Sequence, residues 1–329
     1  MKLLVCGGSD IFFRRVLPVL PDLGVTAVEV ASKSGRFPES PEPPLPLTRR
    51  GDPEAALGDS PAEVVYVTTE NSRHAALARA ALDSGRHVIV DKPAFPDVAT
   101  ATRTAELAAK KGLVLAEATV WADHPRVAAI TRAFAAAQSA PTRLSAVFSF
   151  PPLPPGNFRH RAELGGGALY DLGPYAASPG RVFFDAEPDA VVCRVLSRDL
   201  AVETAFCCLL LYPGGRSLSA TFGCDTGYAN HLDVLGPGLA VAMDRAFTPP
   251  PGTALTLACN GPDGPRIETI PPADAFAAFF ARAFAAMDAG AGEGFARALL
   301  ADARVLEVIR KSACGGQGHA PSRTLPKGK

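Results

Sequence analysis

Short apolar runs alternate with segments of helical periodicity over the first third of the chain. The apolar runs cover residues 2–6, 26–31, 63–69, 87–90 and 113–116. Between them, residues 74–83 and 97–111 carry apolar positions at helical spacing and end at glycine. Strands that are apolar throughout are buried on both faces, as in parallel sheets covered by helices. The pattern therefore predicts an α/β fold built on a parallel sheet.

The pattern changes after about residue 120. Alternating apolar and polar residues at 202–212 and 217–222 flank a Pro-Gly-Gly turn, which predicts an antiparallel hairpin. Residues 274–310 return to helical spacing. We therefore predict two domains, residues 1–121 and 122–311, followed by a loose terminus at 312–329.

The composition is that of an ordinary globular protein. Hydrophobic residues make up 47% of the 329 residues, and 33 basic residues balance 33 acidic ones. A neutral chain has no global field to attract nucleic acid or an anionic membrane. No apolar run reaches the roughly 18 residues of a membrane helix, and the first residues are typical of a strand and turn rather than a signal peptide. These features predict a cytoplasmic protein.

Cysteine usage indicates neither disulfides nor a metal site. The chain has 7 cysteines, an odd number, and none is arranged as C-x-x-C. We expect them to be small buried hydrophobic residues and expect no bound metal ion.

A glycine-containing turn follows the first predicted strand. It reads Gly7-Gly8-Ser9-Asp10-Ile11-Phe12 and keeps only the first glycine of the pattern G-x-G-x-x-G. Such a turn at a helix N-terminus can hold a pyrophosphate, because glycine permits close approach and free N–H groups point at the ligand. We predict that Gly7, Ser9, Asp10 and Ile11 bind a dinucleotide; a purely structural turn is the alternative.

The end of the second strand predicts which dinucleotide binds. Residues Ser32, Lys33 and Arg36 are suited to a 2′-phosphate, which favours NADP(H) over NAD(H). Glu29 is the alternative, as a carboxylate that would bind the ribose of NAD, but this requires the strand to end three residues earlier. Lys33 and Arg36 as plain surface charges are the other alternative.

Polar residues also follow the next two strands. We expect these residues to bind the cofactor: Thr68, Thr69, Asn71 and His74 at and beyond the end of the third apolar run, and Asp91, Lys92 and Pro93 after the fourth. A lysine directly after a buried strand places an ammonium at the ligand edge of the sheet. In the second domain, three glycines at 165–167 lead into a helix that starts at Asp171 or one turn earlier. Asp171 and Tyr175 are four residues apart and share a helical face.

These motifs resemble the Gfo/Idh/MocA family of NAD(P)-dependent oxidoreductases. The resemblance is carried by T-x-N-x-x-H at 69–74, Asp91-Lys92-Pro93 in place of the family's Glu-Lys-Pro, Glu117, and G-G-G-A-L-x-D-x-G-x-Y at 165–175. It implies a doubly wound Rossmann domain followed by an α/β domain with a large open, mainly antiparallel sheet. It also implies a homo-oligomer, a dimer or tetramer, because that sheet often forms subunit contacts in the family.

Within the family, the chain is similar to the NDP-sugar 3-ketoreductases of antibiotic deoxysugar pathways. Segments 9–15, 157–160, 228–230 and 244–250 carry this likeness. It implies NADPH-dependent reduction of a keto group, at C3, on a nucleotide-activated (dTDP) deoxysugar. The alternatives are a dehydrogenase of a free sugar, inositol or glycoside, and a non-catalytic NADP-binding regulator.

The resemblance implies that Lys92 and Tyr175 perform the acid/base chemistry. A tyrosine hydroxyl is protonated at neutral pH and suited to giving a proton, which favours ketone reduction. We expect Tyr175 to be the general acid, with its pKa lowered by Lys92, and Asp171 to orient Lys92 or the sugar. The roles of Lys92 and Tyr175 are open to exchange, and Asp171 as a simple helix N-cap is the alternative.

The remaining candidate residues are assigned to the substrate. Arginine suits bidentate contact with phosphate, and aromatic rings stack on bases, whereas a structural role is the alternative at each position. The full set of expected substrate-binding residues is Glu117, Arg159, His160, Asp171, Tyr175, Tyr228, Asn230 and Arg245.

Overall fold

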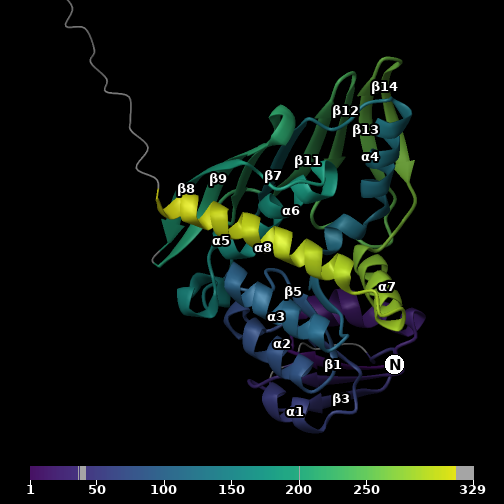
Figure 1. Cartoon of the computed structure of the whole chain (residues 1–329), viewed down its shortest axis with the longest axis vertical. Helices are drawn as coiled ribbons and strands as arrows, with labels where there is room; N and C mark the ends of the chain where they lie inside the picture. Colours follow the sequence, from purple (N-terminus) through teal and green to yellow (C-terminus); the bar gives the residue numbers. More distant parts are fainter. Residues whose placement is uncertain (36, 38–41, 200, 316–329) are drawn as a thin grey trace, which may run out of the picture.

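The computed structural model describes residues 1–35, 37, 42–199 and 201–315 and contains two sheets in opposite halves of the molecule (Figure 1). The chain completes the first sheet before it enters the second. The α/β fold class predicted from the apolar pattern is thus confirmed.

The first sheet is parallel throughout and doubly wound. Its strands lie in the order β3-β2-β1-β4-β5-β6, and each neighbouring pair is parallel. The strands are β1 (Lys2–Cys6), β2 (Ala27–Ala31), β3 (Leu47–Arg50), β4 (Val64–Val67), β5 (His87–Asp91) and β6 (Leu115–Ala118). The order reverses between β1 and β4, so ligands are expected at the carboxyl ends of these strands.

Helices and turns cover both faces of this sheet. One face packs on α1 (Pro53–Asp59), α2 (His74–Asp83) and α3 (Val98–Lys110). The other packs on α7 (Ala275–Asp288) and on the segment after β1. That segment is not the regular helix expected there: a π-helical turn at Phe12–Val16 is followed by 3₁₀ turns at Leu17–Val19 and Pro21–Leu23. Pro18 and Pro21 lack the N–H groups that a continuous helix needs.

The second sheet is large, open and mainly antiparallel, in the order β14-β13-β12-β11-β7-β10-β9-β8. Of the strand pairs described in this sheet, β7 with β10 is parallel and the others are antiparallel. Its strands are β7 (Arg143–Ser149), β8 (Ala190–Asp199), β9 (Val202–Tyr212), β10 (Arg216–Gly223), β11 (Ala229–Gly236), β12 (Leu239–Asp244), β13 (Leu255–Gly261) and β14 (Gly264–Ile270). The hairpin predicted around the Pro-Gly-Gly turn is β9 and β10.

One face of the second sheet carries the core. Side chains of α4 (Pro125–Ala136), α6 (Gly173–Phe184) and α8 (Glu293–Cys314) pack there against alternate residues of the strands. Helix α8 crosses the molecule between the two halves, in contact with α3 and β6 on one side and with α6 and β8 on the other (Figure 1). It continues to Cys314, three residues into the segment expected to be a loose terminus. Residues 316–329 of that segment lie outside the described part.

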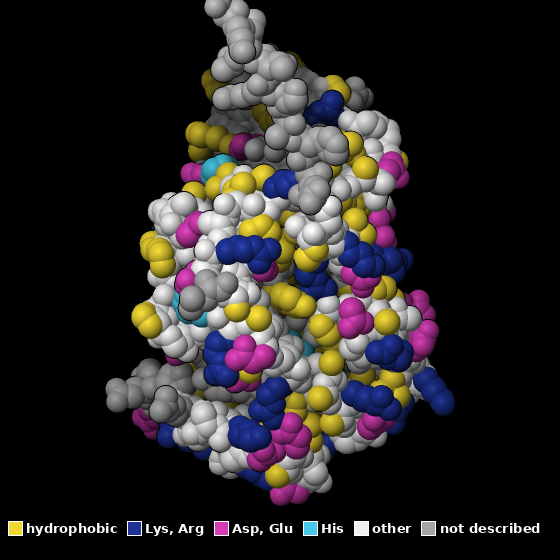
Figure 2. Space-filling view, turned by 90° about the vertical axis from the view of Figure 1, so that its left-hand side faces the viewer, with side chains coloured by type: hydrophobic (Ala, Val, Ile, Leu, Met, Phe, Trp, Pro, Cys, Tyr) yellow, Lys and Arg dark blue, Asp and Glu magenta, His cyan; other side chains and the backbone are white. Residues whose placement is uncertain are grey.

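The opposite face of the second sheet exposes large apolar side chains. Val192 and Leu196 on β8, and Leu209 and Leu211 on β9, are between 41% and 56% exposed. Elsewhere charged side chains of both signs are interspersed, as Figure 2 shows for one side of the molecule. Among the described residues, no helix has the length and apolar character that crossing a membrane requires.

Replacing Gly180 by alanine should lower the free energy of unfolding by about 1–3 kcal/mol. The added methyl group would lie 2.1 Å from the Tyr212 hydroxyl and so push α6 away from β9. Gly58→Ala is the control, because open space surrounds this exposed helical residue, and it should gain about 0.5–1 kcal/mol. Urea unfolding measures both; equal stability of Gly180→Ala and wild type would contradict the close contact.

Candidate active site

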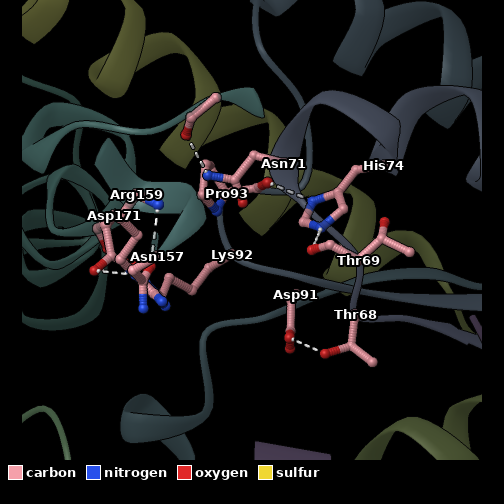
Figure 3. Close-up of polar contacts among 11 residues, drawn as sticks. Thr68, Thr69, Asn71, His74, Asp91, Lys92, Pro93, Asn157, Arg159 and Asp171 are labelled. Atoms are coloured by element: carbon pink, nitrogen blue, oxygen red, sulfur yellow. Dashed lines mark hydrogen bonds and ion pairs between the residues drawn. The ribbon is translucent and has the colours of Figure 1, made fainter. Parts of the chain in front are cut away.

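A chain of hydroxyl groups joins the carboxyl ends of three strands of the first sheet. Ser9 donates to the Thr68 hydroxyl at 2.7 Å, and Thr68 donates to Asp91 at 2.6 Å. The hydroxyl of buried Tyr66 donates to the other oxygen of Asp91. Asp91 is therefore turned toward Thr68, away from Lys92 (Figure 3). These bonds fix the turn after β1 relative to the loops after β4 and β5.

Gly7 is required by close packing at the same edge. Its φ is +123°, and a Cβ there would lie 2.5 Å from the carbonyl oxygen of Thr68. The main chain of the turn therefore lies directly against the end of β4. Asp10 and Ile11, next in the turn, are exposed, Ile11 to 45%.

The end of β2 carries the residues expected to determine the preference for NADP(H) over NAD(H). Ser32 is buried and lies 3.1 Å from the Ser34 hydroxyl, Lys33 is exposed, and Arg36 lies outside the described residues. Strand β2 continues to Ala31 and does not end three residues earlier. The alternative in which Glu29 binds the ribose of NAD is therefore wrong. Glu29 instead forms an ion pair with Arg50 at 2.9 Å.

The loops after β4 and β5 are tied together by His74. Its ring nitrogens lie 3.0 Å from the carbonyl oxygen of Pro93 and 3.1 Å from that of Thr69. Burial lowers the pKa of His74, although Asp91 and the hydrogen bonds to the Pro93 and Thr69 carbonyls act in the opposite direction. Asn71 in the same loop donates to the carbonyl of Gly165 at 2.8 Å and so links the first sheet to the triple-glycine loop.

Lys92 meets Asp171 from the second half of the chain. The ammonium of Lys92 donates to the Asp171 carboxylate at 2.9 Å and to its main-chain carbonyl at 2.5 Å. Arg159 binds the other carboxylate oxygen at 2.9 Å. The same ammonium lies 5.0 Å from the centre of the Tyr175 ring. Lys92 and Tyr175, which are far apart in the sequence, are thus neighbours, and Lys92 extends toward Asp171 and Arg159 (Figure 3).

Two short helices hold the second-domain side of this cluster. Asp171 is the last residue of α5 (Ala168–Asp171), and Tyr175 lies in the first turn of α6. The break falls at Leu172, which occupies the N-cap of α6. The alternative role of Asp171 as the N-cap is therefore wrong, and its carboxylate is used by Lys92 and Arg159.

Charge sets the protonation of the cluster. Burial would raise the pKa of Asp171, but Lys92 and Arg159 outweigh it and hold this pKa well below its usual range. Burial would lower the pKa of Lys92, but Asp171 and Tyr175 outweigh it and raise it. Burial also raises the pKa of Tyr175, and the ammonium of Lys92 only partly offsets this. The expectation that Lys92 brings the pKa of Tyr175 below its ordinary value is wrong; Tyr175 is a neutral phenol at pH 7.

Aromatic rings extend from Tyr175 to the surface. The ring of Phe148 lies 5.3 Å from that of Tyr175 and 6.5 Å from that of Tyr228, which is 50% exposed. The guanidinium of Arg245 lies 5.4 Å from the centre of the Tyr228 ring. Tyr228 and Arg245 are therefore separated from Tyr175 by one ring. Phe247 is buried, and its ring lies 5.1 Å from that of Tyr175.

The other expected substrate residues have internal contacts. Arg159 binds Asp171 and stacks on Phe158 at 4.7 Å, so its charge belongs to the Lys92 cluster. His160 lies 3.2 Å from the carbonyl oxygen of Leu153. Asn230 is buried and bonds to the loop after β12.

Glu117 lies at the end of β6, where it lines a small pocket with Arg181 and Asp302. Arg181 binds Asp302 through two hydrogen bonds of 2.8 and 2.6 Å. Burial raises the pKa of Glu117 to about 8, and Asp302 adds to this, whereas the Ala94 amide acts in the opposite direction. Glu117 therefore carries a proton over most of the neutral range.

Sequence reasoning missed Arg126, which is 1% exposed. It shares one face of α4 with buried Ile130 and Ala133 at i, i+4 and i+7. A charged residue on the apolar face of a predicted helix is the signal that would have identified it.

Comparison with known proteins gives concordant matches. A model described as an oxidoreductase family with an NAD-binding Rossmann fold matches residues 28–119, and the GFO/IDH/MocA C-terminal domain model matches residues 139–238. The chain is 31% identical to a dTDP-3,4-didehydro-2,6-dideoxy-alpha-D-glucose 3-reductase from Streptomyces violaceoruber, over 95% of both chains. A protein of the same name from Actinomadura kijaniata is 31% identical over 85% of each chain.

A solved structure of similar fold is that of KijD10, a 3-ketoreductase from Actinomadura kijaniata in complex with NADP and TDP-benzene. It superimposes with a TM-score of 0.81 at 29% identity, covering 95% of this chain and 98% of that one. Further structures of KijD10 carry replacements of a lysine or of a tyrosine.

Glu117→Gln should alter how stability depends on pH. The pKa of about 8 in the folded protein exceeds the ~4.3 of an exposed glutamate, so the wild type loses stability as pH rises between these two values. Glutamine has no proton to lose, so the free energy of unfolding of the variant should rise relative to that of the wild type as pH increases through this window. Above the window the difference should stay constant. Urea unfolding at several pH values measures this, with exposed Glu106→Gln as control. A difference that is constant with pH would contradict the raised pKa.

Proposed function

The chain belongs to the Gfo/Idh/MocA family of oxidoreductases, and on that basis we propose that it reduces a keto group, at C3, of a dTDP-activated deoxysugar with NADPH. The contact of Lys92 with Asp171 beside Tyr175 carries the proposal, because it gathers a cation and a proton donor at one point. The relatives named as 3-reductases support the choice of substrate class and of position. Biosynthesis of an antibiotic sugar is the corresponding physiological role.

The residues present fit a dinucleotide. The turn at Gly7 brings bare main chain against the ends of β1 and β4, as pyrophosphate binding requires. Buried Ser32 and exposed Lys33 at the end of β2 supply a hydroxyl and a cation suited to a 2′-phosphate. When bound, NADPH supplies the hydride that reduces the carbonyl carbon.

Residues of this chain protonate the carbonyl oxygen and stabilise its developing negative charge. As the carbon is reduced, the oxygen gains negative charge and needs a proton. Tyr175 gives the proton from its phenol, and the ammonium of Lys92 stabilises the developing charge. Asp171 keeps Lys92 protonated and points it toward the site, supported by the 2.9 Å contact between them. Arg159 adds a second cation to the same cluster.

The outer part of the site binds the nucleotide. The ring of Tyr228 is exposed and suited to stacking on a base, and Arg245 beside it is suited to pyrophosphate. Asn230 acts through the loop that carries Arg245, because its side chain bonds to that loop. His160 and Glu117 already bond to main-chain groups of the protein, so we assign them to the edge of the substrate site rather than to direct contact with the reacting carbonyl.

Lys92→Ala and Tyr175→Phe should each lower kcat for a dTDP-3-keto sugar by about 100-fold or more, the usual contribution of a positioned acid. The dissociation constant of NADPH, measured by fluorescence titration, should change little. The controls are Tyr212→Phe, whose buried hydroxyl has no hydrogen-bond partner among the described residues, and Lys110→Ala on the exposed end of α3.

Two results would contradict this function. One is unchanged kcat in both variants. The other is steady reduction of NAD by unphosphorylated sugars with no effect of Arg159→Ala or Arg245→Ala, which would indicate a dehydrogenase of free sugars.

We further propose a cytoplasmic homo-oligomer. The 7 cysteines are all free, which fits a reducing compartment. The exposed apolar side chains of β8 and β9 form a patch of the kind that marks an interface, in which Val192 and Leu209 are paired across the strands.

Leu209→Lys combined with Leu211→Lys should dissociate the oligomer, because burying two ammonium groups in a subunit contact is costly. Size-exclusion chromatography with light scattering should give a dimer or tetramer for the wild type and a monomer for the double variant. Val308→Lys, on the exposed side of α8, is the control and should leave the mass unchanged. A monomeric wild type would contradict the proposed assembly.

A further inference from the structure

The loop that follows β12, residues 244–250, is held from inside by a buried arginine. The guanidinium of Arg126 donates to the main-chain carbonyls of Asp244 and of Arg245, the latter at 2.9 Å. Its Nε lies 3.4 Å from Nδ1 of buried His124. Within the described part of the chain, the partners of the Arg126 guanidinium are main-chain carbonyls and a histidine ring rather than a carboxylate. A buried arginine carries a desolvation cost that an apolar residue of similar size would not. Its hydrogen bonds to the loop therefore indicate a role beyond stability.

Two further side chains fix the same loop. The Asn230 side chain accepts from the Phe247 amide at 3.0 Å and donates to the Thr248 hydroxyl at 2.7 Å. Arg15, from the turn after β1, donates to the carbonyl of Pro249 at 3.3 Å. The backbone of the loop therefore has little freedom.

The constraint is visible at Arg245. Its φ is +47°, in the left-handed region that residues other than glycine rarely adopt. Such a conformation persists only where neighbouring contacts impose it. In this conformation the Arg245 side chain lies over the exposed ring of Tyr228, and the Phe247 side chain packs inside against Tyr175.

We propose that Arg126 is a positioning residue for recognition of the nucleotide sugar: it holds the loop so that Arg245 is preorganised over Tyr228 to receive the pyrophosphate. The inference rests on the proposed function. Arg126 acts only through the main chain of Asp244 and Arg245, since it is 1% exposed and lies behind them. Preorganisation of this kind lowers the entropic cost of binding.

Arg126→Met should raise KM for the dTDP-3-keto sugar by about tenfold or more, the effect of losing one oriented charged contact. We expect kcat to fall by a smaller factor than KM rises, because the same loop also holds Phe247 against Tyr175. KM for NADPH should change little, because among the described residues Arg126 has no contact with the Gly7 turn. The matched control is Arg86→Met. Arg86 also donates to main-chain carbonyls, those of Leu57, Ser60 and Ala62, but at the far side of the first sheet.

A double-variant cycle separates positioning from general destabilisation. Arg245→Ala should raise KM by itself, and adding Arg126→Met to it should have little further effect, because the residue that Arg126 positions is then absent. Full additivity of the two effects on KM would overturn the inference, as would an equal rise of KM in Arg86→Met.

Trypsin gives a readout that does not depend on activity. Arg245 is exposed and followed by Ala246, so the bond between them is a tryptic site that a fixed loop protects. Cleavage there, mapped by mass spectrometry, should be several times faster in Arg126→Met than in wild type or Arg86→Met, and an unchanged rate would overturn the inference. If the wild type is active but Arg126→Met has an unchanged KM, only the positioning role is overturned. If the wild type itself does not turn over the dTDP-3-keto sugar, the proposed function is overturned.

Discussion

The carboxylate of Asp171 is the point on which the site depends, because it joins the two halves of the chain. Lys92 reaches it from the end of the first sheet and Arg159 from the second domain, with 2.9 Å contacts to both oxygens. A buried carboxylate is tolerated only when its oxygens are satisfied. Displacing either half would leave Asp171 or Lys92 without its partner, so the pair holds the ammonium beside Tyr175. The Asn71 bond to Gly165 reinforces the same junction.

The three glycines before Asp171 serve this junction through their small size. A Cβ on Gly165 would lie 2.7 Å from that of Asn71, and one on Gly166 would lie 2.5 Å from the carbonyl oxygen of Arg159. Gly167 has a φ of +101° and faces Glu203, which accepts from the Leu169 amide. The sequence alone indicates only that three glycines precede a helix, whereas the structure shows that these glycines permit close packing.

The sequence was sufficient where burial alone decides the structure. Apolar runs mark strands covered on both faces, so β1, β2, β4 and β5 could be predicted within a few residues. β6 begins two residues later than expected, because Leu113 and Val114 are equally apolar but precede the strand. The polar edge strand β3 has no such signature. Pairing between distant residues, such as Lys92 with Asp171 or Arg126 with the loop at Arg245, leaves no periodic trace, and only the family motif indicated the first of these pairs.

The charge balance of the Lys92 cluster favours an anionic ligand, although the chain as a whole is neutral. Lys92 and Arg159 supply two cations against the single carboxylate of Asp171, whose pKa they hold low, so the cluster keeps one net positive charge across the neutral range. Burial meanwhile keeps the phenol of Tyr175 protonated. A site that presents a cation and a neutral acid is better prepared to stabilise a new alkoxide than to remove a proton from an alcohol. At neutral pH the free site therefore holds the protonation state from which reduction starts, a protonated phenol beside an ammonium.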